Sequence, residues 1–254
     1  MNQLWHGSKL PRQRLVAGYD HGIHLGTREQ ALMRNSAFLH RVSFSGDRVR
    51  RSKDLGMGWG PKIRDARRFG FDAISYLNRY EGLSNEDIVR ISEHRNPDGL
   101  TDGQFRKLAP SARESVIALA EEDVRVIEVV PGPGRVLMYH GTSVENVREM
   151  AEKGFSPEGW RAGPNGGRRG MLYLTDDPVN AQWFADRTGE GCVISLSVRA
   201  CDLVVDPENG MSNSVVEEMT NGSGPSYLAT MTPIPAHLIR VLVRPEIDAS
   251  PVPE

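Results

Sequence analysis

The sequence contains no apolar run that approaches the ~20 residues needed to span a bilayer. Its first residues, Met-Asn-Gln-Leu-Trp-His, lack the charged and then apolar pattern of a secretory signal. There are only two cysteines, Cys192 and Cys201, so no disulfide framework is implied, and their spacing matches no zinc pattern. We therefore expect a cytoplasmic protein with no membrane partner and no metal site, in which both cysteines are buried as small side chains.

What the sequence does contain is ordinary for a soluble globular protein: 39% of its 254 residues are hydrophobic and 25% are charged. Domains of roughly 100 to 150 residues are the commonest, so this length allows one large domain or two small ones. The net charge of −2 hides an asymmetry, because residues 1–132 hold 21 Lys and Arg against 17 Asp and Glu, and the remainder hold 10 against 16. Basic residues crowd one stretch, which either meets phosphates or forms a solvated face. They are Arg48, Arg50, Arg51, Lys53, Lys62, Arg64, Arg67 and Arg68.

The clearest candidate for a domain boundary is Pro131-Gly132-Pro133-Gly134, which can continue neither a helix nor a strand. We predict domains at 1–132 and 133–254, with a helical insertion at about 83–110 in the first and a loose tail at the end of the second. Strands are expected at 42–44, 73–76, 116–119 and 124–130, and at 135–139, 193–198, 203–205 and 238–243; helices are expected at 84–92 and 144–153.

The two halves share an ordered series of short motifs, which indicates an internal repeat. Strand-like residues run into His6-Gly7-Ser8 in the first half and into His140-Gly141-Thr142 in the second. A short strand that begins with glycine follows in each, Gly22 to Thr27 and Gly170 to Thr175, and each leads to a helix with an early alanine. The alanines are Ala31 and Ala181.

The motifs of the second half resemble the NAD-binding signature of ADP-ribosyltransferases. They are Tyr139-His-Gly-Thr142, Gly154-Phe155 and Gly170-Met-Leu-Tyr-Leu-Thr-Asp-Asp-Pro178, and the resemblance covers most of residues 135–243. In that family the histidine bonds a ribose hydroxyl, the glycine backbone holds the nicotinamide carboxamide, and an aromatic residue stacks on the nicotinamide ring. The resemblance assigns these roles to His140, Gly141 and Tyr173, and it adds Thr142 and Gly170 to the NAD-binding residues.

Cleavage of the nicotinamide ribosyl bond creates an oxocarbenium-like cation, so the site needs a planar clamp for the leaving ring and a nearby carboxylate. In the poly-ADP-ribose polymerase branch the catalytic glutamate precedes an aromatic residue on a late strand, where this chain has Ser226-Tyr227. The rifampin ADP-ribosyltransferase branch uses an aspartate before a proline, which Asp206-Pro207 resembles. We expect Asp206 to be the acid, with Glu217 and Glu218 in reserve; the alternative that Asp206-Pro207 only begins a turn stays open.

The loop before the Tyr173 strand, Asn165-Gly-Gly-Arg-Arg169, covers the pocket in this family. The guanidinium groups of Arg168 and Arg169 would then meet the NAD diphosphate. A plain surface loop is the alternative.

The first half resembles another ADP-ribosyltransferase-like group, which is common in phage and bacterial multi-domain proteins, through 4–8 and 22–31. His6, Gly7 and Ser8 would bind NAD, with His24 in place of the stacking aromatic. If 113–117 is the late strand, Glu114 occupies the position of the catalytic glutamate; Glu81 is the competing choice. A degenerate copy that binds the target or stabilises its twin is the other interpretation.

Together these patterns predict an α+β fold with two ADP-ribosyltransferase-like modules, each made of two small, mostly antiparallel sheets flanked by short helices. The expected activity is transfer of ADP-ribose from NAD, used as a substrate, to a protein, nucleic acid or small-molecule acceptor. Toxin or effector, phage counter-defence and antibiotic-modifying roles are all open. The alternatives are a non-catalytic pair that binds NAD, ADP-ribose or a partner, which Ser226 favours, and an NAD-dependent RNA 2'-phosphotransferase, whose His and Arg set has no clear match here.

Overall fold

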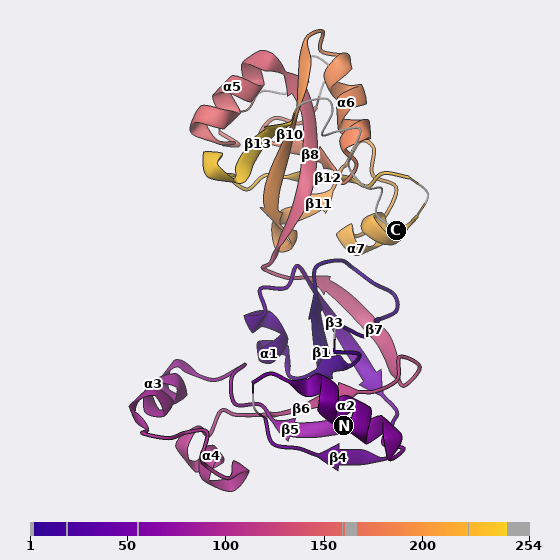
Figure 1. Cartoon of the computed structure of the whole chain (residues 1–254). Helices are drawn as coiled ribbons and strands as arrows, with labels where there is room; N and C mark the ends of the chain where they lie inside the picture. The colour runs from indigo at the N-terminus through magenta and orange to yellow at the C-terminus, as the bar shows by residue number, and fades with distance from the viewer. Residues whose placement is uncertain are drawn as a thin grey trace. The chain divides into compact units, whose positions relative to one another are not determined.

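The computed structural model describes residues 3–18, 20–54, 56–158, 160, 167–222 and 224–242. The chain forms two compact units, Met1–Gly132 and Pro133–Glu254, so their boundary falls within the Pro-Gly-Pro-Gly segment. The fold is mixed α+β with several small sheets (Figure 1). Within the described ranges, no helix combines the length and the apolar character that crossing a membrane requires.

The N-terminal unit contains two sheets that face a shared core. The first has the order β1-β3-β7, with β3 (Phe38–Phe44) antiparallel to both β1 (Leu4–Ser8) and β7 (Val124–Pro131). The second has the order β2-β6-β5-β4, built from β2 (Ile23–Leu25), β6 (Glu114–Ala118), β5 (Ala73–Leu77) and β4 (Val49–Arg51). Its β4·β5 pair is parallel and the others are antiparallel. The core between them contains Leu15, Ile23, Leu25, Val42, Ala118 and Val124.

Helices cover the outer faces of this unit. α1 (Arg28–Met33) begins at a capping box formed by Thr27 and Gln30. α2 (Trp59–Arg68) is not among the elements predicted from sequence, because glycine and proline at its start resemble a loop. Proline is nevertheless compatible with a first helical turn, and the buried residues Trp59, Ile63 and Ala66 recur at helical spacing on the side that packs against the second sheet.

The predicted helical insertion consists of α3 (Asn85–Glu93) and α4 (Asp102–Leu108), which lie together to one side of β5 and β6 (Figure 1). Ser84 and Thr101 cap the two helices, each by accepting a hydrogen bond from a backbone N–H three residues later. Phe105 and Leu77 share the small core that attaches the insertion to the sheet.

The C-terminal unit has a six-stranded sheet with the order β11-β12-β9-β8-β10-β13. Its strands are β8 (Arg135–Ser143), β9 (Leu172–Thr175), β10 (Gly191–Arg199), β11 (Leu203–Val205), β12 (Tyr227–Thr230) and β13 (Ile239–Leu242). The expectation of two sheets in this half is therefore wrong. The sheet consists of two three-stranded parts, β11-β12-β9 and β8-β10-β13. A ladder pair between Tyr139 and Thr175 joins the two parts into one sheet.

Three helices flank this sheet: α5 (Val144–Lys153), α6 (Pro178–Asp186) and α7 (Val215–Thr220). α5 and α6 lie on opposite sides of β8 and β10 (Figure 1), and Ala181 and Ala185 of α6 pack on Val193. Short 3-10 turns, η1 (Ala200–Asp202) and η2 (Ala236–Leu238), lead into β11 and β13. Cys192 is half-buried but Cys201, in η1, is exposed, so the expectation that both cysteines are buried is wrong for Cys201.

The two units repeat one order of elements. The series β1, β2, α1, β3, β5, β6, β7 corresponds in sequence order and in strand pairing to β8, β9, α6, β10, β11, β12, β13. The first strand is bridged to the second by Trp5↔Gly26 in the N-terminal unit and by Tyr139↔Thr175 in the C-terminal unit. The repeated sequence motifs therefore occupy equivalent positions in the two units.

Both units also use a glycine where a helix crosses the first strand. A Cβ atom added to Gly141 would lie 1.9 Å from the carbonyl oxygen of Ala181, and one added to Gly7 would lie 2.8 Å from that of Ala31. Carbon and oxygen atoms that are not bonded stay well over 3 Å apart, so neither position accepts a larger residue without movement of the helix. The glycine of each His-Gly motif is thus required for close packing against the helix that follows the second strand of its unit.

Candidate functional site

A cleft of about 580 Å³ opens in the C-terminal unit where β8 and β9 separate. Small-molecule sites have volumes of roughly 300 to 1,000 Å³. Five of the residues predicted from sequence line the cleft: His140, Gly141, Thr142, Tyr173 and Asp206. They come from β8, from β9 and from the turn after β11, so the topology brings together residues that are far apart in the chain.

His140 lines this cleft and carries a buried hydrogen-bond acceptor. Its Nδ1 lies 2.8 Å from the carbonyl oxygen of Tyr173, and because a carbonyl only accepts, Nδ1 carries the proton. Burial lowers the pKa of His140 to about 4, so the ring is neutral at pH 7 and Nε2 has a lone pair. This buried Nε2 has no partner among the described residues, and a ligand hydroxyl would reach it only after the surrounding side chains move. In the N-terminal unit, His6 makes the same contact with the carbonyl oxygen of His24.

The low pKa of His140 predicts that acid destabilises the C-terminal unit. Between pH 6.5 and about 4 the unfolded chain binds a proton that the folded unit does not, so the free energy of unfolding falls as pH falls, by up to ~1.4 kcal/mol per pH unit. Hydrogen exchange of β10 amides across this range measures the slope. His140→Gln should reduce it, whereas His237→Gln, a change at an exposed site, should not. Equal slopes in the two variants would contradict the assignment.

Tyr173 is held at its hydroxyl end. The hydroxyl donates to Oε1 of Glu208 at 2.9 Å and accepts from the backbone N–H of Arg168 at 2.7 Å. Burial and the hydrogen bond to Glu208 raise the pKa of the hydroxyl, so it stays protonated. A Cβ atom added to Gly167 would lie 2.7 Å from the ring, which shows how closely this backbone approaches Tyr173.

Asp206 is buried and is held by hydrogen bonds within the turn that follows β11. The side chain is 3% exposed, and its Oδ1 accepts from the backbone N–H groups of Glu208, at 2.7 Å, and Asn209, at 3.2 Å. Its Oδ2 accepts from the Asn209 side chain at 2.9 Å. Asp206 therefore closes the turn that follows β11, as the alternative interpretation has it, and it also lines the cleft.

Two charged cleft residues are missing from the sequence-based set, Glu208 and Arg187. Glu208 is exposed, lines the cleft and contacts Tyr173. The second acid of Asp206-Pro-Glu-Asn209 is the signal that points to it. Arg187 is the C-cap residue of α6, and its guanidinium lies 3.7 Å from the centre of the Trp183 ring. In the part of the chain that the structure describes, Arg187 has no carboxylate partner.

Arg168, Arg169 and Gly170 do not line the cleft. The two arginine side chains are exposed, and Arg168 contributes its backbone N–H instead. Asn165 and Gly166 lie outside the described residues. Gly170 forms the turn before β9 with φ of 78°, a conformation that glycine adopts readily. The sequence predicts that these three residues bind NAD. In the structure they lie at the turn before β9 and not along the edge of the strand that lines the cleft.

Glu217 and Glu218, the reserve acids, belong to α7 and stabilise the loop around it. Burial alone would raise the pKa of Glu218, but hydrogen bonds from backbone N–H groups of Tyr227, Met211 and Ser212 outweigh burial and lower it. Glu217 accepts from the backbone N–H of Asn213. Neither glutamate lines the cleft.

The corresponding slot of the N-terminal unit is nearly filled. About 20 Å³ remains between His6, Gly7 and His24, which is far below the roughly 300 to 1,000 Å³ of small-molecule sites. The side chain of Gln30 occupies the space, where its Oε1 accepts from the Thr27 backbone at 2.7 Å and from the Ser115 hydroxyl at 3.0 Å. The expected NAD site has no room for a dinucleotide in this conformation.

Ser8 and Glu114 lie away from this slot, contrary to the prediction. The hydroxyl of Ser8 donates to the carbonyl oxygen of Leu10. Glu114 precedes Ser115 on β6, so its side chain lies on the opposite face of the strand and pairs with Arg51 and Arg106. Alternation along β6 therefore removes Glu114 from the position of a catalytic acid.

Glu81, the competing acid, borders a larger cleft of about 810 Å³ that His24 also lines. Its carboxylate accepts from Arg34 at 2.8 Å and from the Asn78 side chain at 3.0 Å. Nε2 of His24 lies 2.6 Å from Asp20. This cleft shares His24 and Glu81 with the site expected in the first half, whereas His6, Gly7 and Ser8 do not line it.

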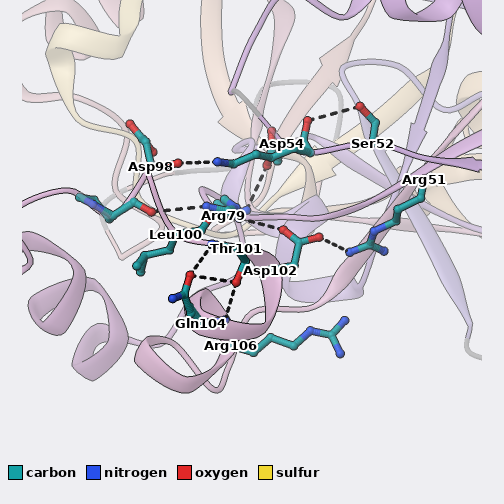
Figure 2. Close-up of polar contacts among 12 residues, drawn as sticks. Arg51, Ser52, Asp54, Arg79, Asp98, Leu100, Thr101, Asp102, Gln104 and Arg106 are labelled. Carbon is teal, nitrogen blue, oxygen red and sulfur yellow. Dashed lines mark hydrogen bonds and ion pairs between the residues drawn. The ribbon is translucent and has the colours of Figure 1, made fainter.

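The basic stretch at 48–68 makes many of its contacts inside the N-terminal unit. Arg50 pairs with Asp65, and Arg51 pairs with Asp102. Figure 2 shows Asp102 between the guanidinium groups of Arg51 and Arg79, the second of which is 1% exposed. The pairs of Asp102 connect β4 and the residues just after β5 to α4 of the helical insertion, and the pair of Arg50 connects β4 to α2. These guanidinium groups therefore help to stabilise the fold. The basic stretch is neither a simple phosphate-binding surface nor a simple solvated face.

Comparison with known sequences assigns no family to this chain. No family model matches it. No curated protein gives a match either. Any assignment of function must therefore be argued from the cleft and from the resemblance of its motifs.

Proposed function

We propose that the C-terminal unit binds NAD in its cleft, breaks the nicotinamide ribosyl bond and transfers ADP-ribose to an acceptor. Both units would then be ADP-ribosyltransferase-like modules. The observation that carries the proposal is the convergence of His140, Gly141 and Tyr173 on one cleft of suitable volume, with the carboxylates of Asp206 and Glu208 beside them. Four of the residues that the motif resemblance assigns to NAD binding, these three and Thr142, thus line one space.

Each residue has a physical reason for its role. The Tyr173 ring, fixed at its hydroxyl, would stack on nicotinamide. Nε2 of His140 would accept a hydrogen bond from a ribose hydroxyl. The backbone of Gly141 would hold the carboxamide, because β8 and β9 form no ladder pair at this residue in the described chain. Arg187, which has no carboxylate partner in the described ranges, would meet the diphosphate.

The bond cleavage follows from these positions. When the bond between the ribose anomeric carbon and nicotinamide breaks, its electron pair goes to the ring nitrogen and nicotinamide leaves as a neutral molecule. The ribose then carries positive charge, which fixed carboxylates in a partly water-excluded cleft stabilise. The acceptor attacks the anomeric carbon and loses a proton.

The experiment is to measure nicotinamide release from labelled NAD by the full chain. Wild type should release nicotinamide, and Tyr173→Ala should lower kcat/KM by about 10- to 100-fold, because loss of a buried stacking contact costs about 1 to 3 kcal/mol. Phe69→Ala truncates an exposed aromatic residue in the N-terminal unit and should have no effect. Saturable NAD binding without any release would favour a non-catalytic binding module and contradict the proposal.

A degenerate role is favoured for the N-terminal unit, since Gln30 fills the slot beside His6 and Gly7. We propose that this unit shares the module fold without cleaving NAD in that slot. Its contribution would be to bind the acceptor or to stabilise the chain.

A further inference from the structure

We propose that Glu208 is the base that takes the acceptor's proton, and that Asp206 is a positioning residue that holds Glu208 in place. This inference rests on the proposed NAD cleavage and changes the assignment of its acid. Asp206 is the residue that the motif resemblance selects, whereas Glu208 is selected only by its contacts in the cleft.

Asp206 is poorly placed to accept a proton. Its carboxylate already accepts hydrogen bonds from two backbone N–H groups and from the side-chain amide of Asn209. The side chain is also 3% exposed. A base needs a free lone pair within reach of an incoming nucleophile, and these three bonds on two oxygens direct the carboxylate toward its own turn.

Glu208 has the opposite environment. Its side chain is exposed and lines the cleft, and Oε1 accepts from the Tyr173 hydroxyl at 2.9 Å. Oε2 has no hydrogen-bond partner among the residues that the structure describes. The backbone N–H of Glu208 is fixed by Asp206 at 2.7 Å, so the turn presents this carboxylate to the cleft.

Contact with Tyr173 places Glu208 at the end of the cleft where the bond breaks. The bond to be cleaved joins the ribose to the same ring that would stack on Tyr173. Glu208 is hydrogen-bonded to the hydroxyl of Tyr173 and lines the same cleft, so it would lie beside a ribose whose nicotinamide stacks on that ring. The Tyr173 hydroxyl keeps its proton, because burial and Glu208 disfavour the phenolate, so this hydroxyl does not compete as the base.

The chemical step balances without a further reactant. An acceptor O–H or N–H attacks the anomeric carbon, the bond to nicotinamide breaks, and the electron pair of that bond goes to the nicotinamide nitrogen. The acceptor's proton moves to Oε2 of Glu208 and then to solvent. With water as the acceptor, the products are nicotinamide, ADP-ribose and a proton.

The test compares Glu208→Gln, Asp206→Asn and a matched control, Glu152→Gln on the exposed face of α5, in the full chain with NAD. Glu208→Gln keeps an oxygen for Tyr173 but removes the base, so kcat should fall about 10²-fold or more while KM changes little. Asp206→Asn should lower kcat together with the protection of the 206–209 turn from hydrogen exchange.

Chemical rescue separates a base from a structural contact. Glu208→Ala opens space beside Tyr173, and added formate should restore part of its nicotinamide release, whereas formate should not restore Asp206→Ala. A wild type that releases nicotinamide and a Glu208→Gln variant that matches it would overturn this inference alone. A wild type that releases none would overturn the proposed function, and this inference with it.

Discussion

Gly141→Ala should destabilise the C-terminal unit by about 3 kcal/mol or more and abolish nicotinamide release. The new Cβ would lie 1.9 Å from the carbonyl oxygen of Ala181 and 2.7 Å from the backbone nitrogen of Ala185. Overpacking usually costs about 1 to 3 kcal/mol, and here the obstacles are backbone atoms of α6 that move only with the whole helix. Because α6 also carries Arg187 and forms a wall of the cleft, its displacement would disturb the site as well as the core.

Urea unfolding followed by hydrogen exchange of β10 amides measures this effect in the C-terminal unit. The matched control is Gly103→Ala in α4, where an added methyl group meets no atom within 4 Å. That change should leave stability unchanged or raise it by about 0.4 to 1 kcal/mol. Wild-type stability in Gly141→Ala would show that the contact between β8 and α6 is not as close as described.

Arg79→Met should destabilise the N-terminal unit by about 3 kcal/mol. The Arg79 side chain is 1% exposed, and its guanidinium donates to Asp102 at 2.8 Å and to the carbonyl oxygen of Leu100 at 2.9 Å (Figure 2). The guanidinium also lies over the Phe105 ring. Removing one member of a buried ion pair typically costs about 3 to 5 kcal/mol. The lower value is expected, because Arg51 remains beside Asp102.

Arg90→Met provides the comparison within the same insertion. Arg90 is about half exposed and pairs with the buried Asp87, which also accepts hydrogen bonds from the backbone and hydroxyl of Ser111. Because Asp87 keeps these bonds and water can replace Arg90, the loss should be about 1 kcal/mol. Urea unfolding and hydrogen exchange of α4 amides should therefore separate the two variants clearly. Similar losses in both would mean that burial of Arg79 does not determine the attachment of α4.

The features that sequence predicts correctly are those set by neighbouring residues. Ser84 caps α3 because a serine at that position accepts from the backbone of the first turn, whatever the rest of the chain does. His-Gly at the end of a strand occurs in both units, and both histidines contact the carbonyl oxygen of the second strand. The boundary near Pro133 likewise follows from local backbone restrictions.

The features that sequence misses depend on which way a side chain faces in the folded unit. Glu114 has the right residue type on a late strand, but alternation along β6 directs Ser115, and not Glu114, toward His6. Arg187 and Glu208 reach the cleft only through the packing of α6 and the turn that Asp206 closes. Periodicity and motifs carry no information about such distant contacts.

The filled slot of the N-terminal unit illustrates the same limit. Gly7 keeps its close contact with α1 just as Gly141 does with α6, so the short motif is present in both. The side chain of Gln30 then decides whether space remains. A unit of this chain can therefore carry the motif without having space for a ligand. Whether space remains depends on a few side chains that the motif does not include.

The most direct test of the account is a crystal structure of the full chain soaked with NAD or ADP-ribose. We expect density in the C-terminal cleft, with a ribose hydroxyl on Nε2 of His140 and, for NAD, the nicotinamide ring against Tyr173. An empty C-terminal cleft at saturating ligand, or a dinucleotide bound elsewhere, would contradict the claim that β8 and β9 separate to form the NAD site.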